Sequence, residues 1–140
     1  MTRREQIISA IKSSLAGTSG VSTRIYRSRV EAFKKAEHPS IIVEPVTDTA
    51  NHNTTPRIIW ELIVTVTILI RGDEPDIAAD DALADIHSKI MGSSTISDLV
   101  VDIQPVKTDW QFIDADDTLA VIINQYRITY QTLIDNLESI

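Results

Sequence analysis

The chain has 140 residues, of which 43% are hydrophobic and 24% charged, and its formal net charge is −7. This length and composition are those of a globular protein with a real core, so we expect one domain over residues 1–140. The absence of cysteine excludes disulfides and cysteine-based zinc sites. No apolar run reaches the ~18 residues of a membrane span, and the amphipathic start does not fit a secretory signal. We therefore expect a protein that is made in the cytoplasm and does not enter a membrane.

The charge is unevenly distributed along the chain. Residues 1–35 hold eight Lys/Arg and two acidic residues, whereas residues 36–140 hold five and eighteen. This asymmetry predicts two surfaces of opposite sign, suited to self-assembly or to docking with different partners. The alternative is a set of solvated charges with no partner. The acidic total argues against sequence-specific DNA binding, which needs clustered Lys/Arg.

The pattern over residues 2–16 predicts a helix. Thr2 and Glu5 fit a capping box, and Gly17 lies where a left-handed C-terminal cap is expected. Four apolar residues fall on one stripe, which we assign to the core rather than to a partner-binding face: Ile7, Ile8, Ile11 and Leu15.

A short strand is predicted around residues 24–28, and it carries an arginine cluster. Arg24, Arg27 and Arg29 place three guanidinium groups within six residues. Charges of this kind can protect a solvated sheet edge, or they can dock an acidic neighbour through bidentate pairing. We favour docking, because the rest of the chain is rich in acids.

A second strand is predicted over residues 40–46, and a polar stretch follows it. Residues 47–55 lack periodicity and lie between two prolines, which predicts a mobile hairpin connection. A long connection of this kind is often functional or disordered, and we include Asn51, His52 and Asn53 among the candidate contacts with a partner.

The stretch over residues 56–71 gives the strongest signal in the chain. Its even positions, from Ile58 to Ile70, are all apolar, and period-two alternation with many β-branched residues predicts a strand. At ~3.3 Å per residue it is about 50 Å long, well beyond a usual strand. The odd face includes Ile59, Ile63 and Leu69, so we expect a second chain to pack there. The alternative is one long hairpin with a half-buried outer face.

The remaining elements complete the predicted fold. One helix is expected from about Pro75 to Met91, a strand from Leu99 that is interrupted at Pro105 and continues to Ile113, and a last strand over residues 119–133. Asn124 breaks the apolar face of that last strand, which predicts a bulge or an edge there. The fold class is therefore α+β, with a mostly antiparallel mixed sheet and two main helices on one face.

No motif for catalysis or metal binding is present. His38, His52 and His87 lack zinc-site spacing, and His87 reads as a helix residue at the boundary of the core. The acidic residues of 73–85 lack the spacing of a calcium loop, and no phosphate loop or nucleophile motif occurs. We expect no metal, no cofactor and no enzyme activity.

Several segments together carry a family resemblance. They are Tyr26-Arg-Ser-Arg29 after a short helix, Pro39-Ser-Ile-Ile-Val43 at a strand start, Arg71-Gly-Asp73 before an acidic helix with Ile86-His87, then Ile103-Gln-Pro105, Asp109-Trp-Gln111 and Tyr126-Arg-Ile-Thr-Tyr130. In this order the chain resembles the tail terminator proteins of tailed bacteriophages, of the lambda minor tail protein U type. The resemblance covers nearly the whole chain.

The resemblance implies a structural protein of the virion tail or neck, assembled in the host cytoplasm. Such proteins form a hexameric ring that caps the tail tube, ends its polymerisation and offers a surface to the head connector. The implied partners are other copies of the chain, the tail tube protein, the head–tail connector or neck protein, and a sheath protein if the tail is contractile. DNA would pass through the lumen without sequence-specific binding, and an acidic lumen would repel it.

Within such a ring, we expect the arginine cluster to meet an acidic patch on a neighbouring subunit or on the tube. Three other functions stay open. One is a different neck or head-completion protein of the same virion. Another is a small dimeric ligand-binding α+β domain, and the third is an unrecognised hydrolase.

Overall fold

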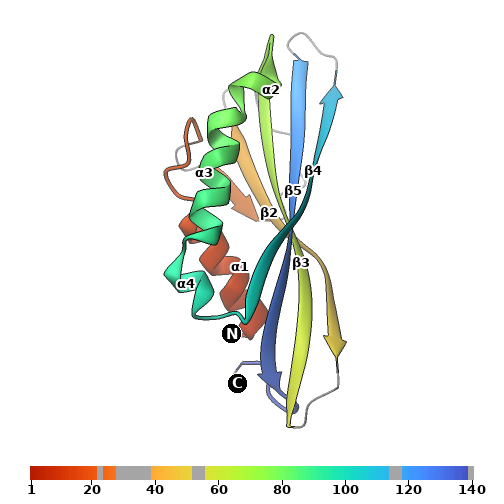
Figure 1. Ribbon diagram of the computed structural model, residues 1–140. Helices are drawn as coiled ribbons and strands as arrows, with labels where there is room; N and C mark the ends of the chain where they lie inside the picture. Colours follow the sequence, from red (N-terminus) through yellow and green to blue (C-terminus); the bar gives the residue numbers. More distant parts are fainter. Residues whose placement is uncertain (22–23, 28–38, 52–55, 114–117, 139–140) are drawn as a thin grey trace.

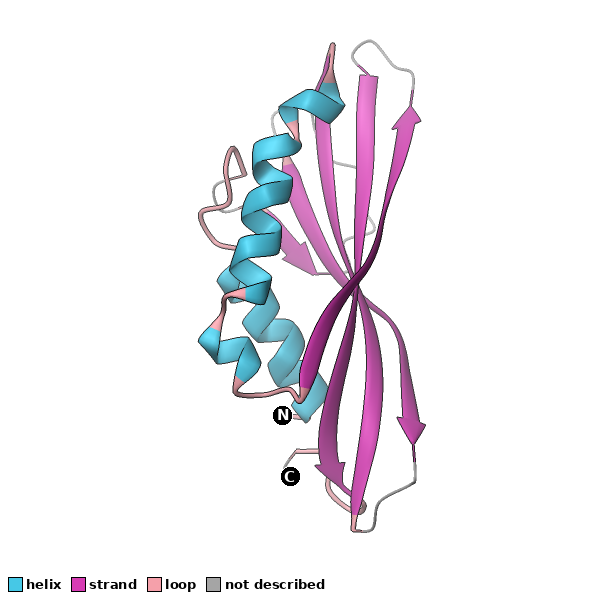
Figure 2. Cartoon of the chain, viewed as in Figure 1, coloured by secondary structure: helices cyan, strands magenta, loops and turns pink. Residues whose placement is uncertain are grey.

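The protein folds into one mixed sheet with all its described helices on one face (Figures 1 and 2). The computed structural model describes residues 1–21, 24–27, 39–51, 56–113 and 118–138. The sheet order is β1-β2-β3-β5-β4. The elements are α1 (Arg3–Ser14), β1 (Ile25–Arg27), β2 (Ser40–Asn51), β3 (Arg57–Gly72), α2 (Pro75–Ala78), α3 (Asp80–Met91), α4 (Ser94–Ser97), β4 (Asp102–Ile113) and β5 (Thr118–Leu133).

The pairing confirms the predicted fold class. β1 runs parallel to β2, and every other neighbouring pair is antiparallel. β3 and β5 form the centre of the sheet and pair without a break, from Arg57 opposite Leu133 to Gly72 opposite Thr118. The strand predicted over residues 56–71 is therefore the central strand of the sheet.

The core lies between the helices and one face of the sheet, which we call the inner face. Even-numbered residues of β3 point to it, and Leu62, Val64, Val66 and Ile68 are fully buried. The predicted stripe of α1 is buried against this face together with residues of α3 and α4. We call the opposite, helix-free face the outer face. Its β3 residues are the odd-numbered ones, because side chains alternate along a strand.

Helix α1 begins as predicted, but Glu5 takes a different partner. The Thr2 hydroxyl accepts a hydrogen bond from the Glu5 backbone N–H at 3.1 Å, which satisfies one free donor of the first turn. The Glu5 carboxylate is instead bound by Arg27 of β1 through both guanidinium nitrogens. Gly17 has φ +80°, in agreement with the expected left-handed residue after the helix.

The prediction of a polar hairpin connection over residues 47–55 is wrong for its first half. β2 continues to Asn51, because Thr47 to Asn51 pair in register with Ile63 to Ile59 of β3. The polar side chains are accommodated because this end of β2 is largely exposed. A register shift between Pro45 and Thr47 marks a β-bulge where the prediction ended the strand. Residues 52–55 lie outside the described residues.

Three further features of the elements differ from the predictions. The helix expected from Pro75 to Met91 is two helices, which meet at Ala79. β4 begins at Asp102 rather than at Leu99, and it continues through Pro105 by means of a bulge between Pro105 and Lys107. Asn124 marks neither a bulge nor an edge of β5, whose pairing with β3 is continuous.

Asn124 is tolerated on the inner face because its amide is hydrogen-bonded. It is 9% exposed. Its Nδ2 donates to the Val66 carbonyl at 3.2 Å, and its Oδ1 accepts from the Thr108 hydroxyl at 3.0 Å. The side chain thus joins β5 to both of its neighbouring strands.

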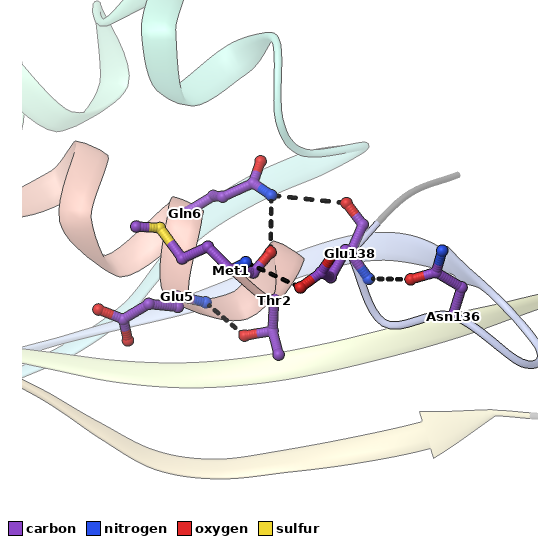
Figure 3. A network of polar contacts seen from close by, with 6 residues as sticks. All are labelled: Met1, Thr2, Glu5, Gln6, Asn136 and Glu138. Atoms are coloured by element: carbon purple, nitrogen blue, oxygen red, sulfur yellow. Dashed lines mark hydrogen bonds and ion pairs between the residues drawn. The ribbon is translucent and has the colours of Figure 1, made fainter.

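The two described ends of the chain meet beside α1 (Figure 3). The Met1 ammonium contacts the Glu138 carboxylate at 2.8 Å, and Gln6 Nε2 donates to the carbonyls of Met1 and Glu138. The Arg3 N–H also donates to the Leu137 carbonyl at 2.7 Å. The start of α1 is therefore fixed to the segment that follows β5.

Candidate assembly surfaces

The outer face of β3 and β5 is the first candidate surface. Ile59, Ile63 and Leu69 all lie on it, as the alternation predicts, and each is half-buried in the single chain. Leu69 is paired with Val121 of β5, which lengthens the apolar stripe. Charged pairs interrupt the stripe, since Arg127 Nε contacts the Glu61 carboxylate at 3.0 Å. The face therefore combines half-buried apolar side chains with charged ones.

The edge strand β4 is the second candidate surface, and sequence reasoning did not assign it. Ten of its twelve residues are exposed. Trp110, Phe112 and Ile113 are 51%, 55% and 50% exposed. Large apolar side chains grouped at a long sheet edge mark an interaction site or an aggregation hazard. The signal in the sequence was the pair of aromatic residues at positions 110 and 112.

The features that protect an edge strand occur in only one half of β4. The first half contains Pro105, the bulge before Lys107, and the charged residue Asp102. Such features prevent another strand from pairing. After Asp109, the second half has neither proline nor charge up to Ile113. We call residues 110–113 the open half of β4, since no strand of the described residues pairs with its free side.

A cleft of about 480 Å³ lies between α3 and β4, with β5 as its floor. Leu83 and His87 of α3 face Val106 and Trp110 of β4 across it. His87 is exposed, rather than at the core boundary as predicted, and its ring stacks on Tyr126 at a centroid distance of 6.5 Å. Asp80, at the start of α3, also lines the cleft and gives its rim a negative charge.

The arginine cluster is used within the chain where the structure describes it. Arg24 donates to the carbonyls of Pro39 and Gly20, each at 2.8 Å. Arg27 forms its bidentate pair with Glu5, and this pair lowers the pKa of the Glu5 carboxyl. Arg29 lies outside the described residues, as do His52 and Asn53. Asn51 is exposed at the end of β2.

A buried polar network beneath α1 holds this helix on the sheet. Arg4 Nη1 contacts the Asp48 carboxylate at 2.9 Å, and the Tyr130 hydroxyl donates to the same oxygen. Burial and this carboxylate raise the pKa of Tyr130 well above its usual range. Trp60 stacks on Tyr130 and donates to the Thr132 hydroxyl at 2.9 Å. The Arg4, Tyr130 and Trp60 donors each have a partner here, whereas the Asp48 Oδ1 is buried with none among the described residues, and we assign the network to stability.

Among the described residues, no group of three or more His, Cys, Asp or Glu side chains is arranged to hold a metal ion. Within the same ranges, no helix is both long and apolar enough to cross a membrane.

Comparison with known proteins gives a likeness of fold. No protein-family model matches the sequence. A search of curated proteins finds no match. Among solved structures, the chain is similar to a chain of the virion of a native gene transfer agent particle. The TM-score is 0.59 at 9% sequence identity, over 92% of this chain and 97% of the other. At that identity, what the two chains share is a fold.

Proposed function

We propose that the protein is a structural component of a phage-like virion, and that it acts as a tail terminator. Copies of the chain would form a ring, hexameric in the family that the sequence resembles, on the end of the tail tube. The ring would stop tube growth and present a surface to the head connector, and no chemical reaction would be involved. DNA would pass through its opening.

The observation that carries the proposal is apolar surface that one copy leaves uncovered. The β4 edge exposes two aromatic residues, and the outer face exposes parts of Ile59 and Ile63. A lone soluble chain of this size seldom keeps such surface. The match of fold over nearly the full length of a virion chain supports the same proposal.

The direct test is the length of the tail tube. Particles produced without this protein are expected to carry tubes of uncontrolled length that lack heads, and expression in trans should restore uniform tails. Tubes of normal length in its absence, with heads that fail to join, would instead indicate a neck or head-completion protein. Electron microscopy of the particles distinguishes these outcomes.

The outer face gives a second test in the purified protein. Ile63→Asp places a charge in the apolar stripe, where Ile63 is half-buried, so we expect weaker assembly on the tube with little loss of folding. Thr65→Asp is the matched control. It places the same charge two residues further along the same face, at a position that is not one of the three apolar candidates. Equal tube binding by wild type and Ile63→Asp would remove the outer face from the proposal.

A small dimeric ligand-binding domain is the second candidate function. The cleft between α3 and β4 favours it, because about 480 Å³ lies within the range of small-molecule pockets. Mass measurement in solution together with imaging separates the candidates. A ring with a central hole supports the terminator, and a compact dimer supports the binding domain.

A further inference from the structure

The two edges of the sheet lie at the same level along the strands. One row of paired residues crosses the whole sheet. It runs from Ile25 of β1 through Ile41, Ile68 and Ile122 to Trp110 of β4. The next rows connect Tyr26 to Asp109 and Arg27 to Thr108 in the same way. The short strand β1 therefore stands level with the start of the open half of β4.

The two edges also have compatible directions and faces. β1 is parallel to β2, and three antiparallel steps then lead to β4, so β1 and β4 run in opposite directions. Ile25 and Trp110 both lie on the inner face, since they belong to one row of paired residues. Brought together from two copies, these edges would form an antiparallel pair with inner side chains beside inner side chains.

The charges at the two edges have opposite signs. Beside β1, a pocket is lined by Lys12 of α1, Ile25 and Arg27. Lys12 supplies its positive charge, because Arg27 is paired with Glu5. Beside β4, a pocket on the same face is lined by Trp110 and three aspartates, which are Asp76, Asp80 and Asp81. Opposite potentials on two patches favour contact between them and set their orientation.

From these three observations we propose that β1 of one copy pairs with residues 108–110 of β4 of the next, where the open half begins, so that the sheet continues from subunit to subunit. The pairing rests on the proposed ring and specifies its subunit contact. In this register Tyr26 lies opposite Asp109 of the next copy, and Ile25 lies opposite Trp110. Repetition of one such contact between different patches gives a closed ring if the rotation from copy to copy closes, and an open filament if it does not.

In this contact, a second copy of the chain covers the exposed aromatic edge of β4. The neighbour's β1 would cover Trp110 and close one side of the cleft between α3 and β4. Within one copy, Tyr26 and Asp109 are separated by four strand spacings, or about 19 Å, so they cannot be linked inside a subunit.

Disulfide trapping tests the register, since the chain has no cysteine of its own. Tyr26→Cys with Asp109→Cys, oxidised at assembly concentration, is expected to give a ladder of linked copies on non-reducing gels, ending at the ring. The matched control is Tyr26→Cys with Gln104→Cys, on the same outer face but four pairing rows, or about 13 Å, further along β4. It should yield less than a tenth of that product.

The outcomes separate the contact from the proposed function. A six-fold ring that forms without the 26–109 link overturns the contact and leaves the terminator proposal standing. Linked dimers from Asp109→Cys alone would show that β4 pairs with itself, and this too overturns the contact. A ladder that never closes, with tails of normal length in particles lacking the protein, would leave the pairing but reject the terminator.

A charge exchange checks the same contact without cysteine. Lys12→Glu alone and Asp80→Lys alone are each expected to weaken self-association at least tenfold, whereas the double variant should recover most of it. Circular dichroism confirms that each variant is folded. Additive losses in the double variant would contradict the pairing of the two edges.

Discussion

The Tyr130 hydroxyl shows how one atom fixes a helix on the sheet. It donates to Asp48 of β2, which also holds Arg4 of α1, and Asp48 is nearly buried. A hydrogen bond to a charged acceptor contributes about 1.5–3 kcal/mol to stability. Without the Tyr130 donor, the Asp48 Oδ2 keeps only Arg4 among the described residues.

Tyr130→Phe is therefore expected to lower the free energy of unfolding by about 1.5–3 kcal/mol. Tyr126→Phe is the matched control, because Tyr126 is buried on the same strand and its hydroxyl makes no hydrogen bond among the described residues. Urea denaturation of both variants gives the comparison. Equal losses would mean that the Asp48 contact does not contribute.

The Glu5–Arg27 pair makes a pH-dependent contribution. Arg27 lowers the pKa of Glu5 below its usual 4.5, so the folded state binds this proton less readily than the unfolded state. The stabilisation is present above pH 4.5 and is lost as the pH falls through the lower folded value. The Glu5 side chain is 39% exposed, so solvent screening limits the contribution to less than ~1 kcal/mol.

Glu5→Gln is expected to be less stable than wild type at pH 7, and the difference should disappear as the pH falls below the lowered pKa of Glu5. The measurement is the free energy of unfolding of both proteins across that range. A difference that stays constant with pH would mean that the charge of Glu5 has no role.

At the scale of elements, the alternation along β3 was sufficient to predict its position and its buried face. The continuation of β2 to Asn51 could not be predicted, because Thr47 to Asn51 gain their order from pairing with β3 and not from burial. The prediction of a bulge or an edge at Asn124 is wrong for a related reason. Its amide is satisfied by Val66 and Thr108, which are far away in sequence. Contacts of this kind follow from the tertiary structure alone.

Only part of the candidate site could be predicted from the sequence, for the same physical reason. The outer-face residues Ile59, Ile63 and Leu69 follow from period-two alternation. Pairing of Arg27 with Glu5 depends on how α1 docks against β1, and a local pattern cannot show this. The exposure of Trp110 depends on which strand forms the edge, and strand order is set by the whole fold.

The two faces of β3 give a prediction with adjacent residues. Ile68 is fully buried in the core, so Ile68→Ala is expected to cost about 2–5 kcal/mol of stability. Leu69→Ala is on the outer face and should cost clearly less in the single chain. Thermal unfolding measures both. If Leu69→Ala is the more damaging variant in a monomer, the assignment of faces is wrong.

At the scale of the whole molecule, opposite charges at the two sheet edges predict that self-association depends on salt. Attraction between exposed charges is screened over about 10 Å at 0.1 M salt and about 3 Å at 1 M. We expect the association constant to fall at least severalfold between 0.05 and 0.5 M NaCl. Sedimentation at several salt concentrations provides the measurement.

The control for the salt effect is a variant with one edge neutralised, Asp76→Asn with Asp80→Asn and Asp81→Asn. Its association should be weaker and nearly independent of salt. Association that strengthens with salt in the wild type would indicate an apolar contact, with the outer face as the stronger candidate.

The meeting of the two chain ends has a practical consequence. Met1 contacts Glu138, and the Arg3 N–H donates to the Leu137 carbonyl, so the start of α1 and the segment after β5 are held together. An affinity tag or a fluorescent fusion attached to Met1 removes the ammonium charge that contacts Glu138, and it is therefore expected to loosen the anchor of α1.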